Sequence, residues 1–162
     1  MIRDSYNTPE FFPEKKDIHQ YLSGYADGEG CFCVSLNKSK RHKIGWEIRP
    51  SFSVSQNKDR ASVLELFKTY FRCGTIRPDR SDYTLKYEVR AIDELVMKVL
   101  PHFEKYPLLS NKQHEFERFA EVCKMIKCKE HLTKDGFQRI LSIAKSINRS
   151  GNKKYLREKI KI

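Results

Sequence analysis

The sequence lacks an apolar run long enough to cross a membrane, and it lacks paired Cys-x-x-Cys spacing. Residues 1–16 are polar and mixed in charge, unlike a secretory signal, so we expect a soluble protein of a prokaryotic cytoplasm, a chloroplast or a mitochondrion, with no membrane partner. The five cysteines are odd in number and do not indicate a disulfide framework. Cys123, Cys128 and His131 suggest zinc, but their four-residue gap and missing fourth ligand fit that metal poorly, so buried, reduced thiols are expected.

Acidic residues are scarce relative to basic ones. The chain of 162 residues has 21 Asp and Glu against 32 Lys and Arg, which gives a formal charge of +11. This excess favours a polyanionic partner, nucleic acid first, because binding releases condensed counterions. Apolar residues (39%) and aromatic residues (12%) suffice for one hydrophobic core. We expect a single domain, with a core over residues 1–131 and a C-terminal helix and basic tail over residues 132–162.

Hydrophobic periodicity predicts the order helix, two strands, helix, two strands, helix, and further helices. Pro101 is expected to kink or stop the third helix, and Ser110 and Thr133 are expected to cap the two that follow. The fold class is therefore α+β, an αββαββα core whose four-stranded antiparallel sheet is saddle-shaped, with additional C-terminal helices. The expected helices are 17–27, 59–71, 92–105, one after Ser110 and 135–148, and the expected strands are 31–37, 46–56, 75–78 and 83–90.

The first two strands alternate strictly between apolar and small polar residues. Phe32, Val34 and Leu36 would face inward, whereas the alternate residues form a face rich in Ser, Asn and Arg. A sheet with one packed face leaves the other available for a ligand. A β-ribbon fits the DNA major groove, so this polar face is predicted to read base edges.

The run from Leu22 to Gly30, Leu-Ser-Gly-Tyr-Ala-Asp-Gly-Glu-Gly, is the most informative stretch. Gly24 and Gly28 lie four apart on one helix face, which lets a second backbone approach closely. If that backbone is the same helix of a second copy, a two-fold axis places the two Glu29 carboxylates side by side. Such a pair under a basic groove would bind divalent metals. A glycine-rich helix end with incidental acids is the alternative.

This run resembles the signature of the LAGLIDADG homing endonucleases, and Glu29 stands where that family has its metal-binding acid. The resemblance continues through residues 52–57, 73–76, 106–112, 115–116, 131–136 and 146–148. A single copy of the motif implies a homodimer that cuts a long pseudo-palindromic double-stranded DNA site. Each subunit would hydrolyse one strand with Mg²⁺ or Mn²⁺ and no other cofactor, leaving short 3′ overhangs.

The resemblance also implies site residues. Glu29 and the carbonyl of Gly28 would bind the metal, and Gln56 and Lys112, or Lys105 in place of the latter, would order solvent around the scissile phosphate. The dimer interface would comprise Tyr21, Ser23, Gly24, Asp27 and Gly28. The expected DNA contacts are Ser35, Asn37, Lys38, Arg41, Glu47, Arg49, Ser51, Ser53, Arg77 and Lys86. Arg90 is an alternative to Lys86 for a contact to a phosphate or a guanine.

Three alternatives to a nuclease remain at this level: an RNA maturase of the same fold, a DNA-binding protein of that fold that has lost cleavage, and a basic β-platform that coats nucleic acid without sequence preference. Retention of Glu29 argues against lost cleavage. Strong discrimination between DNA sequences would argue against the platform.

Overall fold

The computed structural model describes residues 17–79 and 83–147, so the predicted basic tail beyond residue 147 lies outside the described residues. Helices and strands alternate in the predicted order. The helices are α1 (Ile18–Glu29), α2 (Ser62–Phe71), α3 (Ile92–Glu94), α4 (Leu100–Lys105), α5 (Lys112–Lys127) and α6 (Lys134–Ser146), with short turns η1 (Lys58–Arg60), η2 (Leu95–Val99) and η3 (Glu130–Leu132). The strands are β1 (Gly30–Lys38), β2 (Trp46–Asn57), β3 (Thr75–Pro78) and β4 (Thr84–Val89).

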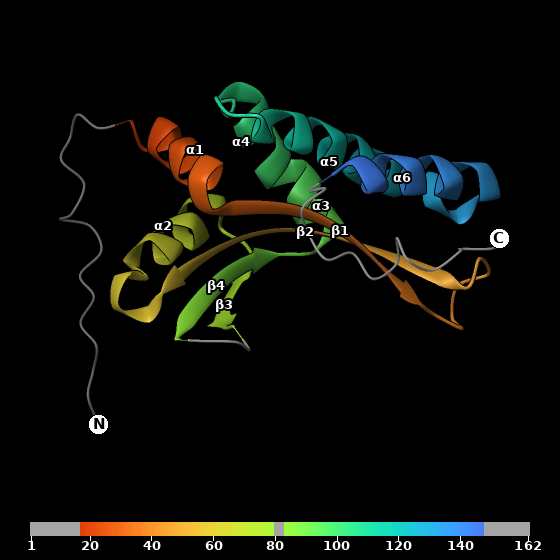
Figure 1. Ribbon diagram of the computed structural model, residues 1–162, viewed down its shortest axis with the longest axis horizontal. Helices are drawn as coiled ribbons and strands as arrows, with labels where there is room; N and C mark the ends of the chain where they lie inside the picture. The colour runs from red at the N-terminus through yellow and green to blue at the C-terminus, as the bar shows by residue number, and fades with distance from the viewer. Residues whose placement is uncertain (1–16, 80–82, 148–162) are drawn as a thin grey trace.

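The four strands form one antiparallel sheet in the order β1-β2-β4-β3, which confirms the predicted α+β class. Gly30 pairs with Val54 at one end of the β1–β2 ladder, and Lys38 pairs with Trp46 at the other. Figure 1 shows this long hairpin extending past β3 and β4, with α4, α5 and α6 on one side of it. The sheet thus has a helix-covered inner face and an outer face opposite the helices.

The core lies between the inner face and the helices. Phe32 of β1 packs against Phe52 of β2, with ring centroids 5.2 Å apart, and both side chains are fully buried. Phe116 and Phe119 of α5 reach Phe32, so α5 covers the centre of the sheet. Tyr87, whose orientation the sequence leaves open, is also fully buried, and its hydroxyl donates to the carbonyl of Cys73. Burial raises the pKa of Tyr87 far above its usual range.

Pro101 neither ends the third helical segment nor stands at a break in it. The backbone stays helical from Ile92 to Lys105, but η2 is a π-helix of five residues directly before α4. Proline has no N–H to donate to the preceding turn, and its ring crowds the carbonyl four residues earlier. A wider π turn at this point accommodates that crowding within a continuous helical segment.

Two helix boundaries differ from the predicted ones, and a third agrees with its prediction. α1 runs through Gly28 and ends at Glu29 instead of ending at Asp27, and the Asp17 side chain caps its first turn. Asn111, not Ser110, is the N-cap residue of α5, although the Ser110 hydroxyl does accept from the Lys112 N–H. Thr133 caps α6 as predicted, because its hydroxyl accepts from the Gly136 N–H.

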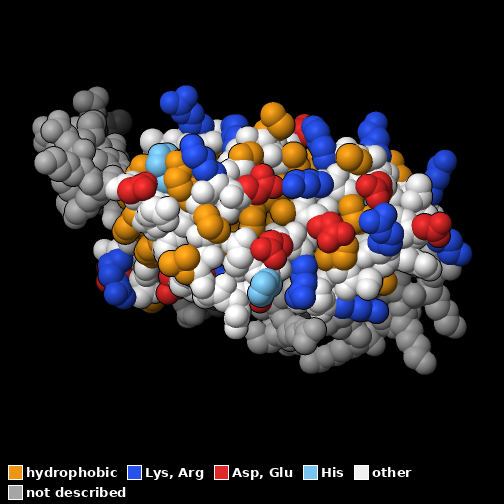
Figure 2. All heavy atoms as spheres, turned by 90° about the horizontal axis from the view of Figure 1, so that it is seen from above, with side chains coloured by type: hydrophobic (Ala, Val, Ile, Leu, Met, Phe, Trp, Pro, Cys, Tyr) orange, Lys and Arg blue, Asp and Glu red, His pale blue; other side chains and the backbone are white. Residues whose placement is uncertain are grey.

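The helical side carries charges of both signs. In Figure 2 lysines and arginines alternate with carboxylates over this face, so it shows no continuous basic surface. The expectation of buried thiols is wrong for Cys128, which is exposed, whereas Cys123 is buried in the core. None of the described helices is long and apolar enough to span a membrane.

Candidate functional site

Glu29 is the last residue of α1, and its side chain is exposed. The chain passes directly from this residue into β1 at Gly30, whose N–H donates to the carbonyl of Ala26 and closes the helix. A β-carbon at Gly30 would lie 2.5 Å from that carbonyl oxygen, so only glycine allows this tight transition. The helix-to-strand junction therefore fixes the carboxylate at the edge of the sheet.

Lys112, the first residue of α5, reaches across to the end of α1. Its ammonium donates to the carbonyls of Ala26 (3.2 Å), Gly28 (3.3 Å) and Gly30 (2.8 Å). These are carbonyls at the negative end of the helix, where a cation is stabilising. A positive charge is thereby placed beside Glu29.

Lys105, the other lysine considered from the sequence, lies elsewhere. Its ammonium is 5.3 Å from the centroid of the Tyr106 ring. It borders a hollow shared with His19, Tyr70 and Lys98, and not the carbonyls at the end of α1. Of the two lysines, it is Lys112 that the structure places against Gly28.

The exposed face of α1 carries Gln20, Tyr21 and two glycines. Tyr21 is half exposed, and Gly24 and Gly28 are exposed on the same face. A β-carbon added to either glycine would meet no atom within 4 Å. Packing within this chain therefore does not require glycine at these positions, and the face is open to a second backbone.

Ser23 and Asp27 do not belong to this open face, in contrast to their expected place in the interface. Ser23 is 2% exposed and its hydroxyl donates to the carbonyl of Tyr106, 2.7 Å away. Asp27 accepts from the N–H groups of Leu109 and Ser110, at 3.1 and 3.0 Å, and from the Ser110 hydroxyl. Both side chains hold α1 to the loop between α4 and α5 of the same subunit.

The electrostatics of Asp27 match this role. Partial burial raises the pKa of its carboxyl, but the hydrogen bonds from Ser110 and Leu109 and the charge of Lys112 outweigh that effect and hold the pKa below its ordinary value. The ionised carboxylate is thus the form that fits this loop.

A line of hydrogen bonds ties α1 to α2 and α4. Because the Ser23 hydroxyl donates to the Tyr106 carbonyl, its oxygen must accept from His102 Nε2–H, 3.1 Å away. His102 Nδ1 is then the acceptor for the Tyr70 hydroxyl at 2.9 Å, and the Tyr70 oxygen accepts from His19 Nδ1–H at 2.6 Å. Burial, aided by the charge of His19, lowers the pKa of His102 to about 4, so this imidazole is neutral.

Gln56 lies near the end of β2, against α1. Its amide nitrogen donates to the hydroxyl of Tyr25 at 2.5 Å, and its amide oxygen accepts from the Asn57 N–H. Tyr25 stands one helical turn before Glu29 and was not among the expected site residues. Its position in the motif was the available signal, but its partner on β2 was not visible from the sequence.

The outer face of the sheet carries most of the expected DNA contacts. Ladder registers place Ser35 opposite Arg49, Asn37 opposite Glu47, and Arg77 opposite Lys86. Ser53 has the same orientation but is only 7% exposed. Lys38 has the opposite strand parity, and its ammonium lies 5.7 Å from the Trp46 ring, so it does not belong to this face. Arg41 lies in the exposed turn between β1 and β2.

Cations on this face are matched with carboxylates. Arg49 donates to Glu47 at 2.8 Å, Lys86 lies 2.9 Å from Asp79, and Arg77 lies 3.0 Å from Glu88. The Arg49 guanidinium keeps the pKa of Glu47 below its ordinary value. Glu88 was not among the expected site residues, although the alternation of charged residues along β4 carried that signal. Arg90 was considered from the sequence as an alternative to Lys86.

A divalent metal is compatible with the end of α1. The donor set there is an exposed carboxylate, Glu29, and the carbonyl of Gly28, both hard oxygen donors of the kind that Mg²⁺ prefers. Mg²⁺ commonly takes only one or two protein ligands beside water and phosphate oxygens. Within residues 17–79 and 83–147, no three His, Cys, Asp or Glu side chains cluster as a metal site.

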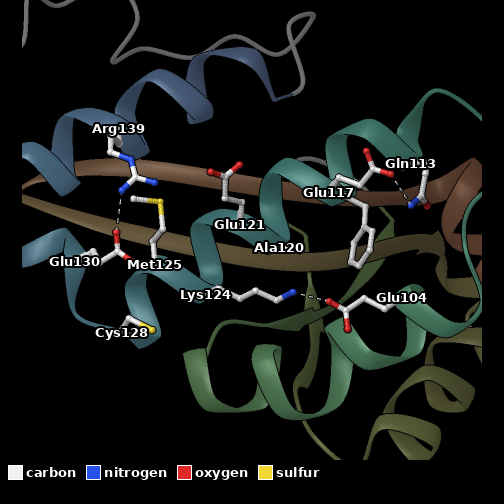
Figure 3. A pocket seen from close by; sticks show the side chains of 11 residues that line it. Glu104, Gln113, Glu117, Ala120, Glu121, Lys124, Met125, Cys128, Glu130 and Arg139 are labelled. Atoms are coloured by element: carbon white, nitrogen blue, oxygen red, sulfur yellow. Dashed lines mark hydrogen bonds and ion pairs between the residues drawn. The ribbon is translucent and has the colours of Figure 1, made fainter.

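A groove on the helical side is a poorer candidate for the site. Its walls come from α4, α5 and α6, and Figure 3 shows two ion pairs within it, Lys124 with Glu104 and Arg139 with Glu130. The helices that carry these pairs lie on the side of the sheet away from the outer face. We therefore place the functional site at the end of α1 and on the outer face.

Comparison with known proteins identifies the family. The family model described as LAGLIDADG endonuclease matches residues 22–123, from the start of the glycine-rich run into α5. The chain belongs to the LAGLIDADG endonuclease family. The match covers α1 from Leu22 onward, the whole sheet and Lys112, so it includes the LAGLIDADG motif together with the strands that follow it.

Solved structures of LAGLIDADG proteins share the fold. The homing endonuclease I-TnaI is 35% identical with a TM-score of 0.77, and the match covers 80% of this chain and 87% of that one. I-SmaMI, solved bound to an uncleaved DNA target in the presence of calcium ions, is 33% identical with a TM-score of 0.81. That match covers 88% of this chain and 48% of I-SmaMI.

A curated relative is the probable intron-encoded endonuclease 2 of Neurospora crassa, 32% identical over 129 residues and 79% of this chain. The chain spans only 28% of that protein's length and about a quarter of the next two curated relatives. It therefore corresponds to only part of these longer relatives.

Proposed function

We propose that the protein is a site-specific DNA endonuclease that acts as a homodimer and needs a divalent metal, Mg²⁺ or Mn²⁺. The observation that carries this proposal is the exposed Glu29 carboxylate at the end of a helix whose open face is formed by Gly24 and Gly28. Two copies that meet through these glycines bring two such carboxylates to one symmetry axis. Each subunit then cuts one strand, and short 3′ overhangs result.

The chain's own residues have separate parts in the reaction. Glu29 and the Gly28 carbonyl would hold the metal, which when bound stabilises charge on the attacking and leaving oxygens of the phosphodiester. Lys112 places a cation next to these groups and stabilises negative charge that develops on the phosphate. Gln56, oriented by Tyr25, holds solvent for the attack.

The outer face supplies the DNA contacts. Its hydroxyls and guanidiniums suit base edges in the major groove, and the excess of basic residues draws the polyanion to the protein. The relatives' names and the DNA bound to I-SmaMI support this assignment of the ligand.

The test uses a duplex that joins the DNA sequences flanking the reading frame, incubated with Mg²⁺ and either the wild-type protein or Glu29→Gln. We expect the variant to bind within about threefold of wild type but to cut roughly 1,000-fold more slowly, because several kcal/mol of metal-assisted stabilisation are lost. Equal cutting by the variant would overturn the assignment of Glu29. Specific binding by the wild type without any cutting would instead identify a cleavage-inactive DNA-binding protein of this fold.

A further inference from the structure

Glu88 is the centre of a three-residue ion cluster on the outer face. It lies on β4 opposite Ser53 and Thr75, and its side chain is only 10% exposed. Oε2 accepts from Nε and Nη2 of Arg77 at 3.3 and 3.0 Å. Arg90 binds both oxygens, with its Nε 3.0 Å from Oε2 and its Nη2 3.2 Å from Oε1. One carboxylate thus holds two guanidiniums.

Both arginines present the same edge to Glu88, the edge formed by Nε and Nη2. A guanidinium is planar and rigid, so fixing one edge also fixes the direction of the adjoining edge formed by Nη1 and Nη2. That adjoining edge can donate two parallel hydrogen bonds to O6 and N7 of guanine. The arginine side chains are 39% and 60% exposed, so the second edge is accessible.

Arg90 also borders a small polar hollow on the outer face. The hollow joins β1, β2 and the residue after β4, and it is lined by Ser35, Asn37, Arg49, Pro50, Ser51 and Arg90. Arg49 is also paired with a carboxylate, since its Nη2 donates to Glu47 at 2.8 Å. The arginines on this face are therefore oriented before any ligand arrives.

Orientation distinguishes base reading from phosphate binding. A phosphate attracts any nearby cation, and a carboxylate next to that cation opposes the attraction. Two guanidiniums without Glu88 would repel each other, and each long side chain would sample several rotamers. The buried Glu88 carboxylate lowers the net charge of the cluster but fixes the direction in which the two guanidiniums point. This combination favours recognition of a particular base over binding of a phosphate.

We propose that Glu88 is a positioning residue that holds Arg77 and Arg90 so that each recognises a guanine in the major groove. This inference rests on the proposed function, since it requires specific DNA on the outer face. It adds two guanine positions to each half of the target, one for each arginine.

The test is selection of bound duplexes from a randomised DNA pool, with Ca²⁺ in place of Mg²⁺, followed by sequencing. We expect Arg90→Ala to abolish guanine preference at one position of each half-site and Arg77→Ala at another. Arg90→Lys keeps the charge but not the forked edge, so it should lose the guanine preference with affinity within about threefold. Glu88→Gln should weaken both preferences about tenfold or more, the range of a two-point contact.

Glu130→Gln is the matched control, because it breaks a comparable pair with Arg139 on the helical side. It should leave all base preferences unchanged, and thermal melting verifies that every variant is folded. Unchanged base frequencies with uniformly weaker binding in Arg90→Ala would show a phosphate contact and overturn the proposal. Intact preferences in folded Glu88→Gln would also overturn it. If the wild type itself selects no sequence, the proposed function fails and the inference fails with it.

Discussion

The ammonium of Lys112 lies 2.8 Å from the carbonyl oxygen of Gly30, the residue that follows Glu29. One lysine on α5 therefore closes the end of the helix that carries the candidate metal ligand. We expect this lysine to contribute both to the stability of the fold and to cleavage. Its charge stabilises the carbonyls at the end of the helix, and in our proposal the same charge lies beside the reacting phosphate.

Replacement of Lys112 by Met should reduce both the stability of the fold and the rate of cleavage. We expect the free energy of unfolding to fall by about 1–2 kcal/mol, because charge-assisted bonds to helix carbonyls are lost, and cleavage to fall by about 100-fold. Urea denaturation and a plasmid cleavage assay measure the two effects. Lys105→Met is the control and should change neither strongly, since Lys105 lies over Tyr106. A larger cleavage loss in Lys105→Met would assign the catalytic lysine to that position.

Gly24→Leu should separate assembly from folding. A β-carbon at this position meets no atom of its own subunit, and glycine is an unfavourable helix residue, so the isolated subunit should be as stable as wild type or more so. The added side chain blocks close approach of a second α1, and we expect the dissociation constant of the dimer to rise by about 100-fold or more. Sedimentation over a range of protein concentrations measures this constant.

Asp27→Asn should lower the stability of the fold without weakening the dimer, the reverse of what we expect for Gly24→Leu. It should lower stability by about 1–2 kcal/mol, because a carboxylate that accepts from Leu109 and Ser110 is lost, and leave the dimer dissociation constant within about threefold. If Asp27→Asn dissociates the dimer and Gly24→Leu does not, the interface lies on another face of α1.

His102 should make stability depend on pH. Its pKa is about 4 in the folded protein against an ordinary value of 6.5, so the unfolded chain binds a proton at higher pH than the folded one. The contribution of His102 is complete above pH 6.5, decreases as the pH falls from 6.5 to 4, and is constant below. The loss amounts to at most about 3 kcal/mol.

Urea unfolding of wild type and His102→Gln at pH 7.5 and 4.5 measures that loss. The variant should be less stable at pH 7.5 but should lose less stability between the two values. His114→Gln, at an exposed position beside Glu117, is the control and should follow the wild type. If His102→Gln loses as much stability as the wild type between pH 7.5 and 4.5, groups other than His102 control the acid response.

The parts of the fold predicted from the sequence are those determined by local patterns. Strict alternation identified β1 and β2, and the glycine-rich run located the end of α1 next to Glu29. These features depend on residues that are close in sequence, within one helical turn or one repeat of strand alternation. The order of elements and the four-stranded sheet follow from them, and the structure confirms both.

The parts that the sequence did not predict depend on distant partners. Ser23 and Asp27 were expected on the open face, but they bind residues about eighty positions away, Tyr106 and Ser110. Helical periodicity predicts on which side of a helix a residue lies, but it does not predict which other segment of the chain covers that side. Glu88 was overlooked although Arg90 is only two residues away, because its other partner, Arg77, lies on β3 and is brought beside it by the register of the sheet.

The unequal lengths of the strands affect how a DNA site would tolerate mutation. β2 has twelve residues, about 40 Å at a rise of about 3.4 Å per residue, somewhat more than the roughly 35 Å pitch of one B-DNA turn. β3 has only four residues and spans about 13 Å. Base changes opposite the long hairpin should therefore weaken binding at many neighbouring positions, whereas the stretch opposite β3 should depend on very few, so a population of target sites should drift fastest there.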